Sequence, residues 1–341
     1  QDIVDILMAN SRLPFSLYGD LNGQINALEL GERRVHALLD EYGDETVSAC
    51  LTELKARASA IMRSQIAALP QGTVSAEDWL DNDGIVDEPL KIALDLTVDG
   101  DRMIMDFSRS SAACAGPVNI SRSTTVAACY VALKHIFGDV PANAGVLEPV
   151  EFRIDDRSIL SVRAPKPVGG YTETILRLID VVFQAIARIA PEPAMACAYG
   201  TINALSLAGH RADGRRWVMF SFFGGGHGAH RGGDGLNHGN APISTATIPP
   251  LEILEAAYPV RFTRWGLRPD SGGPGEMRGG LGAIYEIELL EKNAEVFLFG
   301  ERGRFAPPGI VGGGPAALNR FTFEQDDGDH HPPMASKMVG I

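Results

Sequence analysis

The densest group of residues able to do chemistry lies between residues 224 and 238. Within it, three histidines and one aspartate stand among seven glycines: His227, His230, Asp234 and His238. Imidazole and carboxylate groups serve as acids, bases and metal ligands, so we predict catalysis by His227 and Asp234 and substrate binding by His230 and His238. The spacing is neither the His-x-x-x-His of a metal-binding helix nor the His-x-His of a strand, and we therefore favour a loop that faces a ligand or another subunit over a metal site. The alternative is a solvent-exposed loop whose glycines let the backbone approach a ligand or another subunit.

A second polar group lies between residues 268 and 282, flanked by predicted strands on both sides. Arg268 and Arg278 can donate paired hydrogen bonds to a carboxylate or phosphate, and the glycines beside Asp270 leave backbone amides free for the same anion. We predict that Arg268, Asp270 and Arg278 bind substrate. No Gly-Lys-Ser/Thr run follows, so this is not a Walker A nucleotide-binding loop. Equally open is a structural corner in which the arginines pair with Asp270 and Glu276.

A third group lies in a predicted polar loop, residues 11–24, between two helical segments. Arg12 and Asp20 are predicted to line a substrate cavity, with Asp20 as a further catalytic residue. The ordinary alternative is that Asp20 caps the helix that follows it. Residues 169–174, ahead of a buried helix, present free amides that suit an anion, although helix capping is the first expectation there.

Two kinds of periodicity predict the elements that must position these residues. Apolar residues recur at helical spacing over 44–69, 123–137 and 173–190, and the last of these segments is apolar nearly all round, as in a buried helix. Alternation over residues 92–107, with Asp99-Gly100 at its centre, predicts an antiparallel hairpin with a type I′ turn. Strand-like runs then follow at 217–223, 260–268, 283–291 and 295–299. The pattern predicts an α+β fold: a helical part with a β-hairpin over residues 1–200, and a mostly antiparallel β part with glycine-rich loops over residues 201–341.

Composition narrows the classes of protein. The 341 residues carry 30 Lys and Arg against 43 Asp and Glu, a net charge of -13 that argues against nucleic acid as a partner. Four isolated cysteines form no CxxC pair, which indicates a reducing cytoplasm, and no apolar run approaches the ~18 residues of a membrane span. Glycine is in excess, with 38 residues, and 21 of these lie between positions 221 and 320, where we expect the function. Both ends resemble interior points of a longer chain, so we expect a fragment of a larger polypeptide.

Several ordered motifs together resemble the hydantoinase B/5-oxoprolinase family. They are Ser11-Arg12, Gly19-Asp20-Leu21, Gly169-Gly170, Thr172-Glu173-Thr174, Gly200-Thr201, Gly224-Gly225-Gly226, Asp234-Gly235, the run 268–282, Pro307-Pro308-Gly309 and Gly312-Gly313-Gly314-Pro315. The matches keep their order along the whole chain, which makes the resemblance more specific than any one glycine motif.

The resemblance implies a B-type subunit of a hetero-oligomer whose partner, a hydantoinase A-type subunit, binds ATP with Mg²⁺. Members are similar either to ATP-dependent hydrolases of cyclic amides or to ATP-dependent carboxylases of acetone and acetophenone, so the expected substrate is a small carbonyl compound. A non-catalytic scaffold that docks the ATP-binding subunit is the remaining alternative. The family also implies a divalent metal, Zn or Mn, held by a segment that would precede residue 1, so no metal ligand is assignable in this sequence. The histidine-rich run 224–238 looks closer to the acetophenone carboxylase branch.

Overall fold

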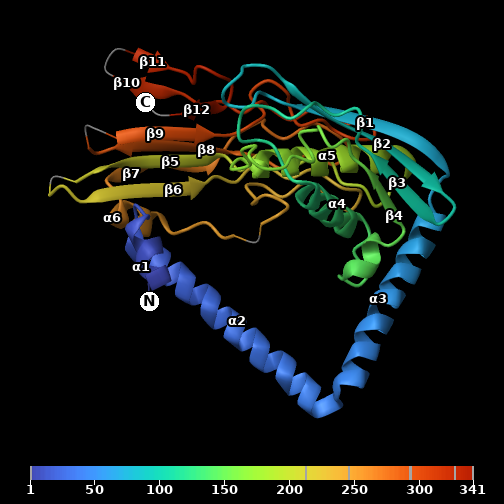
Figure 1. Cartoon of the computed structure of the whole chain (residues 1–341). Coiled ribbons are helices and arrows are strands. Elements are labelled where there is room, and N and C mark those ends of the chain that lie inside the picture. The colour runs from blue at the N-terminus through green and yellow to red at the C-terminus, as the bar shows by residue number, and fades with distance from the viewer. Residues whose placement is uncertain (1, 212, 245, 292–293, 326–327, 340–341) are drawn as a thin grey trace. The chain divides into compact units, whose positions relative to one another are not determined.

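The computed structural model describes residues 2–211, 213–244, 246–291, 294–325 and 328–339. The chain forms two compact units, Gln1–Ala58 and Ser59–Ile341. The boundary at residue 200 between a mixed part and a β part stays a prediction. The first unit holds helix α1 (Asp2–Ala9), helix α2 (Pro14–Tyr42) and the start of helix α3 (Asp44–Ala67), which continues into the second unit (Figure 1). Most of the predicted helix over 44–69 is therefore confirmed.

Helix α2 corrects the prediction of a loop over residues 11–24. The helix begins at Pro14, because proline fixes a helical φ and needs no amide partner in the first turn. Asp20 lies inside this helix and therefore does not cap it. The helix ends at Tyr42 and is followed by Gly43, whose φ of 78° is a conformation that glycine adopts without strain.

The second unit begins with a four-stranded sheet in the order β1-β2-β3-β4. Its strands are β1 (Gly72–Leu80), β2 (Leu90–Asp99), β3 (Arg102–Asp106) and β4 (Val150–Arg153). The predicted β2–β3 hairpin is confirmed, whereas β3 and β4 are parallel. The turn is not type I′: Asp99 pairs with Arg102, and of the two residues between them only Gly100 has a positive φ. Type I′ needs both turn residues left-handed.

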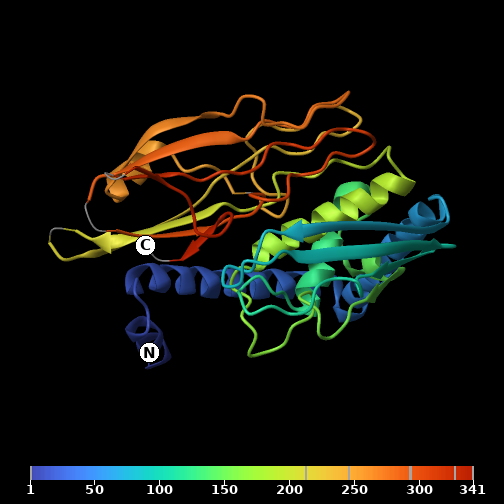
Figure 2. The same ribbon diagram turned by 90° about the horizontal axis from the view of Figure 1, so that it is seen from above.

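Two helices pack beside this sheet. Helix α4 (Arg122–Ile136) begins at Ser121, whose Oγ accepts a hydrogen bond from the amide of Thr124. Helix α5 (Tyr171–Ile189) contacts α4, β1 and β2, and its burial on all sides confirms the prediction (Figures 1 and 2). A 3₁₀ turn, η1 (Ala144–Leu147), precedes β4.

The rest of the second unit is antiparallel β structure. A second sheet has the order β12-β9-β5-β6, from strands β5 (Ala204–His210), β6 (Arg216–Phe222), β9 (Ala294–Phe299) and β12 (Lys337–Val339). Two hairpins accompany it, β7 (Val260–Leu267) with β8 (Ala283–Leu289) and β10 (Phe323–Gln325) with β11 (Gly328–His330), and helix α6 (Leu251–Ala257) precedes β7. Buried Leu207, Trp217, Met219 and Val260 form a core between the second sheet and the β7–β8 hairpin. The four predicted strands in this part are confirmed, and the fold is α+β.

Candidate functional site

A large open cavity lies within the second unit. Its volume is about 2330 Å³, and its walls come from the second sheet, the β7–β8 hairpin and the glycine-rich loops. The wall is mixed in character: apolar residues of β5, β8 and β9 stand beside histidine, arginine and amide side chains. A concave surface that combines apolar area with a few polar groups is typical of a small-molecule site.

Two glycine-rich loops form one side of the cavity by pairing backbone to backbone. We call residues 224–239 the histidine loop and residues 268–282 the arginine loop. The amide of Gly280 donates to the carbonyl of His227 at 2.9 Å, and the amide of Gly235 donates to the carbonyl of Arg278 at 2.8 Å. A Cβ on Gly226 would overlap the carbonyl oxygen of Gly280. Much of the glycine clustering therefore serves close packing of these two loops.

Three of the residues predicted from sequence meet at this cavity: His227, His230 and Arg268. The Nε2 atom of His227 bonds the carbonyl oxygen of Asn240, and since a carbonyl only accepts, Nε2 carries the proton and Nδ1 keeps a lone pair. The Nη1 atom of Arg268 donates to the carbonyl of Leu318 at 2.7 Å, so this guanidinium anchors a neighbouring segment as well as lining the cavity.

Two other predicted residues pair with each other across the two loops. The carboxylate of Asp234 accepts a hydrogen bond from the amide of Arg278 at 2.7 Å and lies 4.0 Å from its guanidinium. The structural alternative paired these arginines with Asp270 and Glu276, and the structure shows other contacts. Arg278 faces Asp234, and Arg268 bonds a backbone carbonyl. Asp270 is exposed and has a left-handed φ of 55°, which places it at a turn.

His238 is turned away from the large cavity and lines a smaller one beside Phe220 and Phe222. The indole of Trp265 donates to His238 Nε2 at 3.2 Å, so Nε2 is an acceptor and the hydroxyl of Tyr285 bonds the same atom. Burial lowers the pKa of His238, which favours the neutral ring that this arrangement requires. His238 thus holds an aromatic cluster together.

Arg12 and Asp20 belong to the first unit, and both residues are exposed. Their predicted role in lining a substrate cavity stays a prediction.

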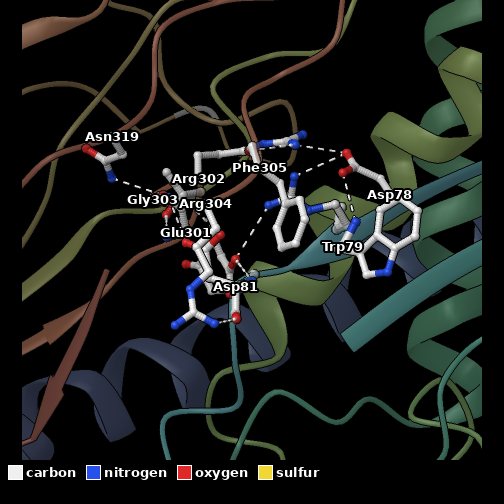
Figure 3. A network of polar contacts seen from close by, with 12 residues as sticks. Asp78, Trp79, Asp81, Glu301, Arg302, Gly303, Arg304, Phe305 and Asn319 are labelled. Atoms are coloured by element: carbon white, nitrogen blue, oxygen red, sulfur yellow. Dashed lines mark hydrogen bonds and ion pairs between the residues drawn. The ribbon is translucent and has the colours of Figure 1, made fainter. Parts of the chain in front are cut away.

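The sequence reasoning missed a buried network of charges close to the cavity (Figure 3). Among the residues that the structure describes, the network joins carboxylates to cations, each at most 5% exposed: Asp78, Asp81, Glu173, Asp180, Glu301, Arg177, Arg302 and Lys337. Arg302 bridges Asp78, at 2.9 Å, and Asp180, while Arg177 lies 3.2 Å from Asp78. Breaking such a pair leaves a charge unpaired in the interior, which is strongly destabilising.

The network ties the end of β1 to α5 and to the segment that follows β9. Asp81 accepts hydrogen bonds from the amides of Gly303 and Arg304 and donates its own amide to Glu301 at 2.7 Å (Figure 3). Asp81 follows strand β1 of the first sheet, and Glu301, 220 residues later, follows strand β9 of the second sheet. The bonds between them therefore fix the first sheet against the second. Arg302 also lines the cavity, so the same bonds hold part of the cavity wall.

Glu173, in the first turn of α5, has an unusual environment within this network. Its Oε1 accepts a hydrogen bond from the amide of Ile202 at 3.1 Å, while Oε2 is buried without a hydrogen-bond partner. Burial, followed by the nearby charge of Glu301, raises the pKa of Glu173 to about 7. Burial also raises the pKa of Asp180 and of Asp78, against the opposing charge of Arg177.

Two signals in the sequence could have located this network. The run Glu301-Arg302-Gly303-Arg304 places three charged residues one position beyond the end of the apolar strand β9. Arg177 and Asp180 lie on a helix predicted to be buried all round. Charged residues in such positions are buried only when they are paired.

Metal coordination finds no support in the described part of the chain. No group of three or more His, Cys, Asp or Glu side chains there is arranged to hold a metal ion, and we assign no chemical step to one. Among these residues there is also no helix that combines the length and the apolar character needed to cross a membrane.

Fold and cavity together define an α+β chain with a glycine-rich, small-molecule cavity. The chain belongs to the hydantoinase B/oxoprolinase family, whose model matches residues 1–339.

Two relatives align with nearly the whole of this chain, but the chain spans only a little more than half of the length of each relative. It is 27% identical to the B-type component of a putative D-/L-hydantoinase of Pseudomonas sp. (strain NS671), over 98% of this chain and 58% of that protein. It is 30% identical to the beta component of the caprolactamase of Pseudomonas jessenii, over 92% of this chain and 55% of that protein.

Solved structures agree with the fold. The ATP-dependent caprolactamase from Pseudomonas jessenii matches with a TM-score of 0.88 and 26% identity, over 100% of this chain and 60% of that chain. A nucleotide-free acetone carboxylase matches with a TM-score of 0.77 and 21% identity, over 84% of this chain and 41% of that chain. The second likeness concerns the fold alone.

Proposed function

We propose that this chain is the B-type subunit of a heteromeric enzyme that hydrolyses a cyclic amide, with ATP bound by an A-type partner subunit. The observation that carries the proposal is the likeness to the ATP-dependent caprolactamase, with a TM-score of 0.88 over the whole chain. The names of the relatives point the same way, since hydantoinase, caprolactamase and 5-oxoprolinase are names of enzymes that open ring amides.

The chemistry explains why two subunits would be needed. A ring amide is a poor electrophile because its nitrogen donates electrons to the carbonyl. Transfer of the γ-phosphoryl group of ATP to the carbonyl oxygen would leave ADP and an activated carbon that water can attack. Addition of water to that carbon and cleavage of the C–N bond then give an acyl phosphate, and a second water molecule hydrolyses it to phosphate and the ring-opened product. In this scheme the A-type subunit supplies the phosphoryl transfer and the present chain supplies the addition of water.

The cavity of the second unit offers groups suited to that second half. His227 has a protonated Nε2 held by Asn240, so its Nδ1 is the nitrogen able to accept a proton from water. His230 and Arg268 line the same cavity and would bind substrate. Asp234, Asp270 and Arg278 would act through the loops, because Asp234 and Arg278 fix the histidine loop against the arginine loop.

A ketone carboxylase subunit is the second candidate, favoured by the histidine-rich loop 224–239. The decisive experiment is ATP turnover by the reconstituted complex on hydantoins, lactams and ketones, with and without bicarbonate. Ring opening without bicarbonate supports the amide hydrolase. Bicarbonate-dependent consumption of a ketone would overturn it in favour of the carboxylase.

A non-catalytic scaffold predicts a different result in the same assay. A His227→Ala variant of the complex would then turn over substrate at the wild-type rate, and the full-length subunit would copurify without stoichiometric metal. Loss of ring opening in that variant, with ATP binding retained, supports a catalytic role for the present chain.

A further inference from the structure

One corner of the cavity is built from polar residues in strained conformations. Thr201, Asn203, Arg302 and Asn319 line it. Asn203 has a φ of 50° and Arg302 a φ of 69°, which are left-handed conformations that non-glycine residues adopt at an energetic cost. Such strain persists only where surrounding contacts over-determine it, and it clusters at functional sites.

The contacts that hold this corner come from the buried charge network. Thr201 Oγ1 accepts hydrogen bonds from the amides of Glu301 and Asn203, both at 3.1 Å. The amide of Ile202, between them, donates to Glu173. Gly200 lies so close to Arg302 that a Cβ there would stand 2.6 Å from its Nε. The corner is therefore rigid and already shaped before any ligand arrives.

Two side-chain donors at this corner have no hydrogen-bond partner among the described residues: Arg302 Nε, which is fully buried, and Asn203 Nδ2, which lies in the cavity wall. Asn319 Nδ2 donates to Asn203 Oδ1 at 2.6 Å and to the carbonyl of Glu301 at 3.1 Å, so the carboxamide oxygen of Asn203 faces Asn319 (Figure 3 shows Asn319 beside Glu301). The opposite side of that carboxamide, Nδ2, donates to no protein group in the described part of the chain, and Asn203 is half-buried in the cavity wall. A half-buried donor of fixed orientation suits an acceptor oxygen on a ligand.

The charges near Asn203 determine which kind of ligand oxygen can accept a hydrogen bond from its Nδ2. Arg302, which lines the same corner, is already neutralised by Asp78 and Asp180, and Glu301 is paired with Lys337. No cation of this network is therefore left to attract a carboxylate or phosphate, whereas a neutral carbonyl needs only the donor. We infer that Asn203 Nδ2 binds the carbonyl oxygen of a neutral cyclic amide at this corner.

This inference rests on the proposed function for the choice of ligand, and ligand binding tests it separately from turnover. The full-length complex without ATP is titrated with ε-caprolactam and with hydantoin by calorimetry, as wild type and as Asn203→Asp. Aspartate tolerates the left-handed backbone and keeps the acceptor for Asn319, but replaces the donor by a second acceptor. Asn203→Gly, which also accepts a positive φ, removes the side chain altogether. Thr322→Ala, elsewhere in the cavity wall, is the matched control.

We expect both Asn203 variants to weaken amide binding by about tenfold or more, as for the loss of one hydrogen bond, while each variant stays folded at the assay temperature and Thr322→Ala binds the amide as the wild type does. Equal affinity in wild type and Asn203→Asp, tighter binding of the ring-opened amino acid than of the lactam, or no amide binding by the wild-type complex would each overturn the inference. ATP-dependent ring opening with an unchanged KM in Asn203→Asp would overturn the inference while leaving the proposed function standing. Amide binding that depends on Asn203, in a complex that opens no ring, would support the inference and contradict the proposed function.

Discussion

The raised pKa of Glu173 makes a quantitative prediction about stability. Its pKa is about 7 in the folded protein against an ordinary value of 4.5. Between these values the unfolded chain loses the proton while the folded protein keeps it, so stability falls as pH rises through that window. The difference of about 2.5 units, at about 1.4 kcal/mol per unit, corresponds to a loss of about 3 kcal/mol that is complete slightly above pH 7.

Replacing Glu173 by glutamine removes this loss. The carboxamide oxygen can still accept from the amide of Ile202, and the NH₂ group takes the place of Oε2, which has no hydrogen-bond partner. We expect the free energy of unfolding of Glu173→Gln to fall less than that of the wild type between pH 4.5 and 7, by about 3 kcal/mol. Other carboxylates of the network also titrate, and comparison of the two proteins cancels most of their contribution.

Urea unfolding followed by circular dichroism at several pH values between about 4.5 and 8 measures this difference. Glu88→Gln, at an exposed position, serves as the control and should run parallel to the wild type. Parallel curves for wild type and Glu173→Gln would refute the assignment of a protonated Glu173 near neutral pH.

Three further substitutions test other parts of the structure. Arg302→Met should lower the free energy of unfolding by about 3–5 kcal/mol, because it strands two buried carboxylates; a loss below about 1 kcal/mol in urea unfolding would contradict the network. Gly226→Ala should lower the free energy of unfolding by about 1–3 kcal/mol, because the added Cβ overlaps the backbone of Gly280. Gly233→Ala, with open space around it, is the control and should unfold at the same urea concentration as the wild type. Equal urea midpoints for the wild type and both variants would rule out the loop pairing. Arg278→Ala should change stability by less than about 1 kcal/mol, since its pair with the Asp234 carboxylate is exposed, yet lower turnover by the complex; unchanged kinetics would make the arginine loop purely structural.

Periodicity predicts most of the second unit. The buried helix α5, helix α4 and the β2–β3 hairpin follow from apolar residues at helical and alternating spacing, and the structure confirms them. The short strand β4 is not predicted, because four residues are too few for alternation to show, and strands β1 and β5 are missed as well. The prediction is wrong for the first turns of helix α2, which are rich in polar residues and glycine; these lower helix propensity without preventing a helix.

The site is predicted less completely, for a physical reason. A glycine-rich composition indicates a loop, and the histidine loop and the arginine loop are both predicted from their composition. The charge network joins Asp78 to Arg302, which lie 224 residues apart in the chain, and no local pattern reports such a contact. Conformations such as the left-handed φ of Asn203 depend on those distant contacts as well, so the polar corner of the cavity is visible only in the structure.

The proposed ATP-driven hydrolysis of a cyclic amide has a fixed stoichiometry, and its measurement is the most informative experiment on this chain. The full-length complex is incubated with a hydantoin or lactam and ATP in bicarbonate-free buffer, and ADP and ring-opened product are quantified together. We predict one ADP for each ring opened by the wild type, whereas the His227→Ala complex should open no ring and release at most about one ADP per active site. ADP formation by the wild type without ring opening, or ring opening that needs no ATP, would contradict the account.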